Sequence, residues 1–275
     1  MIIHLIDGTY ELFRHYYGLR RHSPTHKPFG AVAGVLGTII QMLEEGATHI
    51  GVATDHIVES FRNELWPGYK SSLGMDPDLY GQFVPLEEAL VAMGVATWPM
   101  VELEADDALA SAAFIAAQGS AVEKLCIWTP DKDLAQCVSG TRVVQVDRRS
   151  GQIRDEAGVR AKFGVAPCHI ADYLALVGDA ADGYPGIPRI GAKTAANLID
   201  RYGPIDQFPG HVLGERMELA LLFKKLATLR TDARLFSDVE ALRWRGATDG
   251  FADKAERMGA PALIRRIARW SCRIS

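Results

Sequence analysis

Runs of apolar residues alternate with helix-type stretches over the first 150 residues of the chain. Strands are expected at 2–7, 48–54, 95–101, 124–129 and 142–147, and helices at 30–45, 82–93 and 105–118. This alternation predicts an α/β fold with a mostly parallel sheet and helices on both of its faces.

Strand signals nearly vanish beyond residue 155. Helices are expected there at 156–163, 168–177, 192–202, 214–228 and 260–270. Gly and Pro residues separate these stretches, which predicts a helical second part joined by tight turns.

The composition fits an ordinary globular protein, with 275 residues of which 48% are apolar and 23% charged. No run of 18 apolar residues occurs, and the N-terminus opens in a strand pattern without a basic segment and a cleavage site. We therefore expect a cytoplasmic protein without a membrane span. The four cysteines form no CxxC pair, which indicates reduced thiols, with neither a zinc site nor a disulfide framework.

Acidic residues stand where such a sheet would gather them into one pocket. They are Asp7, Asp55, Glu104, Asp106, Asp107, Asp131, Asp133, Asp179 and Asp182. Three of them follow strand-like runs, and ligands of parallel sheets bind beyond the carboxyl ends of the strands. Each acid alone is better explained as a helix cap or a turn residue, but so many like charges together need a cationic partner. Two Mg²⁺ or Mn²⁺ ions would fill that role, which predicts a metal-dependent phosphoryl-transfer enzyme and foremost a nuclease.

Two cations follow the Asp55 strand closely in sequence. Arg62 and Lys70 could steady a scissile phosphate, and Tyr69 could stack on a base. The structural alternative is a helix surface that carries an exposed lysine.

A glycine-rich hairpin, PGIPRIGAKTA at 185–195, joins two expected helices. Gly186 and Gly191 allow close approach of the backbone to a phosphate, and the N–H groups that open the next helix would face it. Gly186 and Gly191 have the spacing of a P-loop, but Ala192 stands where the P-loop lysine belongs and no strand precedes the loop. The alternative is a hairpin that only reverses the chain.

The net charge of −4 hides an uneven distribution. Residues 183–275 hold 16 Lys and Arg against 10 Asp and Glu. A basic third beside an acidic pocket is typical of a phosphate-binding surface next to a metal site, although a solvated basic helix surface would look the same.

The motifs LIDG, VATD, FRNELWPGYK, ELEADD, TPDKDL, GDAADGYPGI and PRIGAKTA occur in the order found in 5′-nucleases. Over about residues 1–235, the chain resembles the 5′-nuclease domain of bacterial DNA polymerase I, the phage 5′-nucleases and the flap endonucleases. The resemblance implies a PIN-like (Rossmann-like) domain over 1–165, which contains an arch at about 66–100. A helix-three-turn-helix DNA-binding module would follow over 166–275.

The resemblance also implies roles for individual residues. The first metal would be held by Asp7, Asp55, Glu104, Asp106 and Asp107, and the second by Asp131, Asp133, Asp179 and Asp182, with Asp131 near both. Arg62 and Lys70 would contact the reacting phosphate. A K⁺ ion would lie in the hairpin on the carbonyl oxygens of Leu176, Val177, Pro185, Ile187 and Ile190. The DNA backbone would touch Arg189, Ile190, Gly191, Ala192, Lys193 and Thr194.

Two features depart from the family pattern. Gly183 follows the GDxxD motif where Asn is usual, and no basic residue follows Lys70 within a few positions. Indeed no Lys or Arg occurs from 71 to 123, so an arch in this segment would hold a single-stranded flap weakly.

These observations predict a structure-selective 5′-nuclease of DNA replication or repair, with flap endonuclease and 5′-3′ exonuclease activity. We expect a monomer that acts on DNA with 5′ flaps, nicks, gaps or free 5′ ends, with RNA primers on DNA as a further candidate substrate. Two alternatives are a DNA-structure binding protein with weak or no nuclease activity and a PIN-like ribonuclease. The GDxxD pair argues against the first, and the basic helical third argues against the second.

Overall fold

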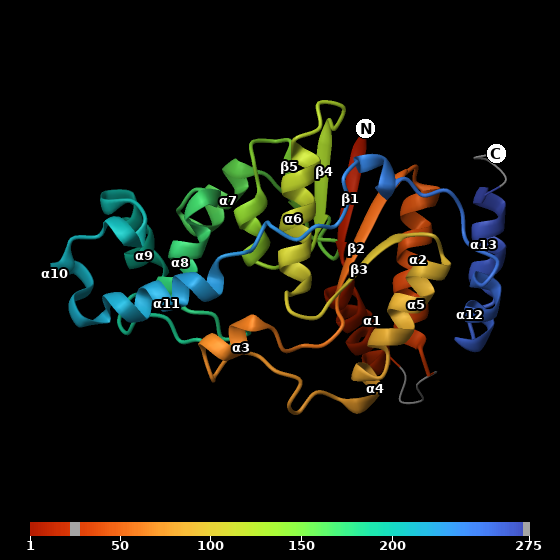
Figure 1. The fold of residues 1–275 in the computed structure, drawn as a ribbon, viewed down its shortest axis with the longest axis horizontal. Helices are drawn as coiled ribbons and strands as arrows, with labels where there is room; N and C mark the ends of the chain where they lie inside the picture. The colour runs from red at the N-terminus through yellow and green to blue at the C-terminus, as the bar shows by residue number, and fades with distance from the viewer. Residues whose placement is uncertain (23–27, 272–275) are drawn as a thin grey trace.

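A six-stranded sheet forms the centre of the computed structural model, which describes residues 1–22 and 28–271 (Figure 1). The strand order is β3-β2-β1-β4-β5-β6, with β1 to β5 parallel and β6 antiparallel to β5. The strands are β1 Ile2–Asp7, β2 His49–Asp55, β3 Ala96–Met100, β4 Lys124–Trp128, β5 Val143–Val146 and β6 Ile153–Arg154. The mostly parallel α/β sheet predicted from the alternation of elements is thus confirmed.

Helices cover both faces of the sheet. The helices of this part are α1 Gly8–His22, α2 Gly30–Glu44, α3 Phe61–Leu65, α4 Pro77–Tyr80, α5 Phe83–Ala92 and α6 Ala105–Ala117. On one face α1, α2 and α5 pack around a core that includes Leu36, Ile39 and Val52. On the other face, the Ala-rich helix α6 packs against a core with Ile3 and Leu125. Small alanine side chains let α6 approach the sheet closely, which holds its acidic N-terminus beside the strand ends.

A helical module follows the sheet and projects from it at the left of Figure 1. Its helices are α7 Glu156–Phe163, α8 Ile170–Val177, α9 Ala192–Tyr202, α10 Gly210–Leu213 and α11 Met217–Ala227, with short 3-10 turns at Pro167–His169, Ile205–Gln207 and Gly214–Arg216, while a further 3-10 turn at Asp133–Cys137 lies between β4 and β5. The module has its own core, in which α8, α9 and α11 enclose Tyr184 and Phe223.

The chain then returns to the sheet, which differs from the expected module of 166–275. Residues after α11 run back across the α/β part, where Phe236 stacks on Trp98 and the Trp244 N–H donates to the Thr48 carbonyl (Figure 1). A 3-10 turn at Val239–Leu242 and the helices α12 Phe251–Arg257 and α13 Ala262–Ser271 complete the chain. Leu263 and Ile267 of α13 are buried in the core around α2. These apolar side chains tie residues 236–271 to the α/β domain, so the helical module ends near α11.

The expected arch at 66–100 is also shorter in the structure. Leu79, Phe83, Leu86 and Leu90 are buried in the same core as α2, so α4 and α5 belong to the α/β domain. The segment 66–76 joins α3 to α4 without helix or strand. Besides the short helices α3, α4 and α10, two longer helices, α1 and α12, were not expected. Helix α1 begins at Gly8, directly after β1 ends at Asp7.

Candidate active site

A cleft at the carboxyl ends of the strands collects most of the expected acidic residues. Its lining includes Asp7, Asp55, Asp106, Asp131 and Asp182. Lys70 enters from the segment after α3. Tyr10, Phe13, Val58 and Met75 form an apolar wall opposite. The sequence interpretation did not find this wall, whose aromatic members lie on the unexpected helix α1.

Asp7 and Asp55 are held by contacts to neighbouring elements. The Asp7 carboxylate accepts from the Tyr10 N–H at 2.8 Å and from the Thr129 hydroxyl at 3.0 Å. The Asp55 carboxylate accepts from the Ala105 N–H at 2.8 Å, which joins the end of β2 to the start of α6. These bonds fix both carboxylates at the strand ends before any ligand binds.

The second acidic set lies beside the first. Oxygens of Asp133, Asp179 and Asp182 all lie within 4.8 Å of one another. One carboxylate oxygen of Asp133 is buried without a hydrogen-bond partner among the described residues. Lys132, which sequence reasoning did not single out, forms an ion pair with Asp179.

The buried carboxylates of the cleft repel one another, and a bound cation would relieve this repulsion. Burial, with the charges of Asp55 and Asp131, raises the pKa of Asp7 to about 7. Burial and the Asp131 charge raise the pKa of Asp106 and of Asp133 well above the ordinary value. Asp131 therefore acts electrostatically on both acidic sets, as a residue between two cations would. Converging carboxylates, an orphaned buried oxygen and raised pKa values fit hard divalent ions with oxygen ligands.

Glu104 and Lys70 connect the cleft to the layer behind it. The Lys70 ammonium lies 2.7 Å from one Glu104 oxygen and 3.2 Å from Asp182. Burial alone would raise the pKa of Glu104, but ion pairs with Lys70 and Arg62 hold that pKa below its usual value. Glu104 is thus ionised and only 3% exposed.

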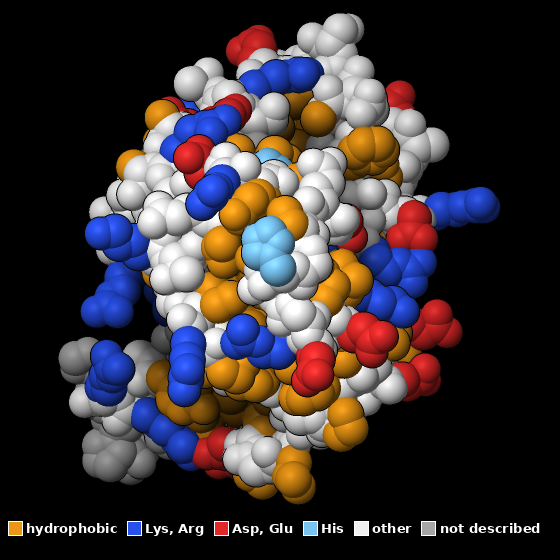
Figure 2. Space-filling view, turned by 90° about the vertical axis from the view of Figure 1, so that its left-hand side faces the viewer, with side chains coloured by type: hydrophobic (Ala, Val, Ile, Leu, Met, Phe, Trp, Pro, Cys, Tyr) orange, Lys and Arg blue, Asp and Glu red, His pale blue; other side chains and the backbone are white. Residues whose placement is uncertain are grey.

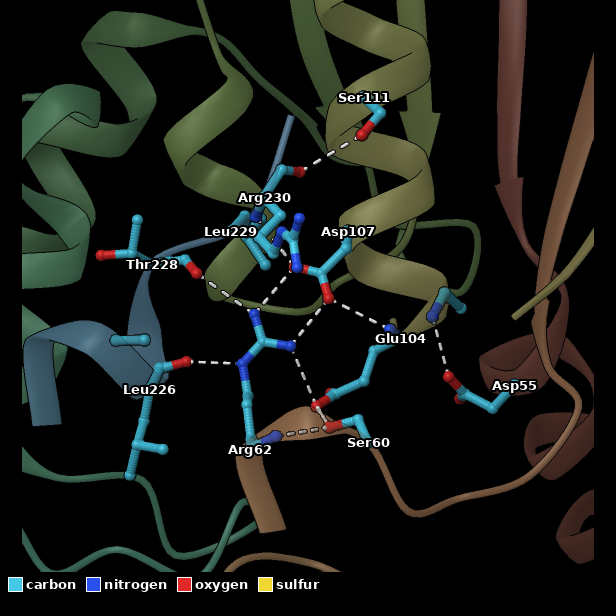
Figure 3. Close-up of polar contacts among 12 residues, drawn as sticks. Asp55, Ser60, Arg62, Glu104, Asp107, Ser111, Leu226, Thr228, Leu229 and Arg230 are labelled. Atoms are coloured by element: carbon cyan, nitrogen blue, oxygen red, sulfur yellow. Dashed lines mark hydrogen bonds and ion pairs between the residues drawn. The ribbon is translucent and has the colours of Figure 1, made fainter. Parts of the chain in front are cut away.

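Arg62 and Asp107 lie outside the cleft, in contrast to their expected roles. Arg62 is 1% exposed and Asp107 is fully buried. The guanidinium bonds both Asp107 oxygens, at 2.7 and 2.8 Å (Figure 3). Asp107 also accepts from the Glu104 and Arg230 N–H groups. A phosphate cannot reach this arginine, and the carboxylate has no oxygen left for a metal.

Tyr69 is likewise not available for stacking on a base. Its ring is 5% exposed and its hydroxyl donates to Glu104 at 3.3 Å. The sequence could not distinguish the buried Arg62, Tyr69 and Asp107 from residues that line the cleft. These three residues stand in the same motifs, FRNELWPGYK and ELEADD, as the cleft residues Lys70 and Asp106.

The hairpin residues lie on the exposed end of the helical module. Arg189 and residues 191–194 are exposed, and Ile190 is half-buried. Gly191 caps α9 without a side-chain bond, so the first N–H groups of this helix face solvent. Arg189 has a φ of 71°, a strained value for a residue with a side chain. Figure 2 shows this end of the molecule, where both basic and acidic side chains surround apolar ones and the acidic ones gather mainly on the right-hand side.

Comparison with known proteins decides the family. A family model described as the N-terminal resolvase-like domain of 5′-3′ exonuclease matches residues 2–164, and one for the C-terminal SAM fold of 5′-3′ exonuclease matches residues 165–249. The chain belongs to the 5′-3′ exonuclease family. The expected class of enzyme, a metal-dependent phosphodiester hydrolase, is thereby confirmed.

Several relatives illustrate the relationship. A 5′-3′ exonuclease of Buchnera aphidicola subsp. Baizongia pistaciae is 33% identical over 83% of this chain and 81% of its own length. The flap endonuclease Xni of Edwardsiella ictaluri is 34% identical over 70% of this chain and 79% of its own length. DNA polymerase I of Pseudomonas aeruginosa is 34% identical over 86% of this chain, which spans only 28% of the polymerase.

Two solved structures share the fold. T5 5′-exonuclease, solved with zinc, superposes with a TM-score of 0.68 at 19% identity and covers 98% of both chains. The catalytic core of Rad2 in complex with DNA substrate superposes with a TM-score of 0.61 at 13% identity, over 97% of this chain and 91% of Rad2.

Gly183, which replaces the usual Asn of the 5′-3′ exonuclease pattern, has a structural explanation. Its φ is 81°, and a Cβ there would lie 2.0 Å from the Gly68 carbonyl oxygen. The Trp66 indole donates to the Gly183 carbonyl, and the Lys70 N–H donates to the Asp182 carbonyl. Glycine therefore lets the Lys70 segment press directly against the acidic loop.

Proposed function

We propose that the protein is a structure-selective 5′-nuclease that cuts DNA at 5′ flaps, nicks, gaps and free 5′ ends. One observation carries the proposal. The loop 178–191 begins with Asp179 and Asp182 at the cleft and ends at the exposed N-terminus of α9. The same short segment thus links the acidic cleft to a surface suited to a duplex backbone.

The loop 178–191 is held rigidly where residues 186–187 pass residues 176–178. The Ile187 N–H donates to the Leu176 carbonyl at 2.8 Å, and the Asp179 and Tyr184 backbones exchange hydrogen bonds. Gly186, with a φ of 70°, comes so near Gly178 that a Cβ would lie 2.4 Å from the Gly178 nitrogen. A rigid loop fixes the span between a bound duplex and the cleft, which supports selection of a junction over a base sequence.

Two divalent ions would complete the site. Asp7, Asp55, Glu104, Asp106 and Asp131 would hold one ion, and Asp131, Asp133, Asp179 and Asp182 the other. Such ions, Mg²⁺ or Mn²⁺, supply charge neutralisation at the phosphate and a deprotonated water at neutral pH. Lys70, which pairs with Glu104 and Asp182, would orient the reacting phosphate. A K⁺ ion on the hairpin carbonyls belongs to the same proposal, since each carbonyl keeps a second lone pair.

The test is a labelled 5′-flap duplex incubated with Mg²⁺, Mn²⁺ or a chelator, with the products sized. We expect a cut near the junction only with metal, and no cut by Asp131→Ala, which should still bind the duplex because the hairpin is untouched. Tight binding without cleavage would favour the DNA-binding alternative. Preferred cleavage of single-stranded RNA would favour the ribonuclease alternative.

A further inference from the structure

The Arg62 guanidinium has all of its hydrogen-bonding capacity in use. It donates to the Leu226 carbonyl at 2.7 Å, to the Thr228 carbonyl at 3.1 Å and to Glu104 at 3.0 Å. Its two further bonds, at 2.7 and 2.8 Å, go to Asp107 (Figure 3). Since a guanidinium has five N–H donors, none is left for a substrate.

Arg62 and its partners belong to three separate parts of the fold. Leu226 lies in the last turn of α11, the final helix of the helical module, and Thr228 follows it. Glu104 and Asp107 open α6, the helix that brings Asp106 to the cleft. Arg62 itself lies in α3, on the segment that leads to Lys70.

Glu104 connects this buried network to the cleft. One of its oxygens accepts from Arg62 and, at 2.6 Å, from the Ser60 hydroxyl. The other oxygen accepts from Tyr69 and pairs with Lys70, which lines the cleft. A displacement of the Arg62 guanidinium would therefore move Glu104 and, through it, the Lys70 ammonium.

We propose that Arg62 is a positioning residue that couples the end of the helical module to the acidic cleft through Glu104. This inference rests on the proposed nuclease function in one respect: Glu104 would hold a metal ion and Lys70 would orient the phosphate. The planar Arg62 guanidinium holds two carboxylates and two carbonyls in fixed positions relative to one another. A flexible lysine ammonium cannot fix all four groups in this way. Outer-layer partners of this kind tune the ligands that they orient.

The decisive variant is Arg62→Lys, which keeps the charge and loses the fork. Calorimetric titration with Mn²⁺, duplex affinity in a chelator, and kcat and KM on a flap duplex are measured together. We expect half-saturation by Mn²⁺ to need roughly tenfold more metal, and kcat to fall by about tenfold or more. Duplex affinity and its salt dependence should stay as in the wild type, because the hairpin surface is unchanged.

Gln136→Ala is the matched control. Gln136 donates to the Ala227 carbonyl at 2.8 Å and accepts from the Leu229 N–H at 3.3 Å, so it holds the same segment without touching Glu104. This variant should lower thermal stability and leave the Mn²⁺ titration unchanged. If Arg62→Lys does not fold, Asp107→Asn keeps the shape of the network while weakening the Arg62 fork, and the same rise in the Mn²⁺ requirement is expected.

Three results with the variants would overturn the proposal. An unchanged Mn²⁺ titration in Arg62→Lys would remove the coupling. An equal shift in Gln136→Ala would reduce Arg62 to general packing. Weaker duplex binding with a smaller salt slope would make Arg62 a phosphate contact after all. Wild-type protein that binds Mn²⁺ but cuts no flap would contradict the proposed function alone, whereas wild-type protein that binds no Mn²⁺ would contradict both.

Discussion

The carboxylates of the cleft are placed where their charges oppose folding. The pKa of Asp133 lies well above its usual value because the group is buried and faces Asp131, Asp182 and Asp179. A cluster retained against such repulsion is typical of a functional site, because stability alone would favour neutral residues.

Asp133→Asn should separate stability from activity. At pH 8 in a chelator, the variant should be more stable than the wild type, because it replaces a buried carboxylate that faces like charges by a neutral group. Cleavage and the stabilisation by Mg²⁺ should both fall. Thermal unfolding with and without Mg²⁺ measures the effect. Asp232→Asn, an exposed carboxylate paired with Arg230, is the control that should respond to Mg²⁺ as the wild type does. A variant less stable in chelator would contradict the repulsion argument.

At the scale of elements, the hairpin between α8 and α9 presents backbone N–H groups and one lysine. Lys193 stands in the first turn of α9 and is exposed. A contact of this kind with a phosphate carries no information about base sequence.

Lys193→Ala should weaken duplex binding about equally for all sequences. The slope of log K against log salt should become less steep by roughly one phosphate contact, about 0.9. Binding is measured by titration at several salt concentrations with two unrelated duplexes. Lys124→Ala, at the start of β4 and so at the amino ends of the parallel strands, should leave the slope unchanged. A loss confined to one duplex would argue against a backbone contact.

The segment 66–76 replaces the expected longer arch, and beyond Lys70 it has no basic residue. Glu59 holds it through the Ser72 N–H and hydroxyl, and Leu73 is 93% exposed at its tip. A short segment without cations beyond Lys70 has little to attract a single strand.

Lengthening a 5′ flap should therefore add little affinity. We compare dissociation constants of a nicked duplex and of long-flap duplexes at two salt concentrations. The constants should agree within about tenfold, or roughly 1.4 kcal/mol. A flap that tightens binding by more than this, with a steeper salt slope, would show that the segment holds single strands.

At the scale of the molecule, the positive charge is distributed differently from the expected pattern. Residues 183–228 hold 6 Lys and Arg against 4 Asp and Glu, while residues 229–275 hold 10 against 6. Most of the basic excess thus belongs to the returning segment, whose helices α12 and α13 pack on the α/β domain away from the hairpin (Figure 1). Within the described residues, no helix combines the length and apolar character needed to cross a bilayer.

The metal-free protein should lose stability as the pH rises from 6.5 to 8.5. The pKa of Asp7 is raised to about 7 and that of Asp106 lies well above its usual value, so the folded state binds protons that the unfolded chain has released. The unfolding free energy then falls with pH, by about 1 kcal/mol over this window from Asp7 alone and further through Asp106. Burial lowers the pKa of His4 and of His15 to about 4, and this opposite effect acts only below the unfolded value near 6.5.

Urea unfolding at three pH values, in chelator and in Mg²⁺, measures this dependence. Mg²⁺ should flatten the decline, since a bound cation favours the ionised carboxylates. A free energy that stays level or rises with pH in chelator would show that the acidic residues are not coupled as the structure has them.

The sequence by itself determined the α/β class, the strand ends and the identity of the acidic loops. Periodicity and turn residues are local, and the carboxyl edge of a parallel sheet follows from strand direction alone. These rules placed Asp7, Asp55 and Asp131 at one edge without any knowledge of packing.

Tertiary structure alone decided which neighbours of a motif face the cleft. Asp106 and Asp107 are adjacent in sequence, yet one lines the cleft and the other lies behind it on Arg62, because successive helix residues point about 100° apart. The packing of α12 and α13 on the α/β domain could not be predicted from the sequence either. An amphipathic pattern indicates that one face of a helix will be buried, but not which surface will bury it. The burial of a side chain depends on contacts between segments that are distant in the sequence, and a local sequence pattern does not predict those contacts.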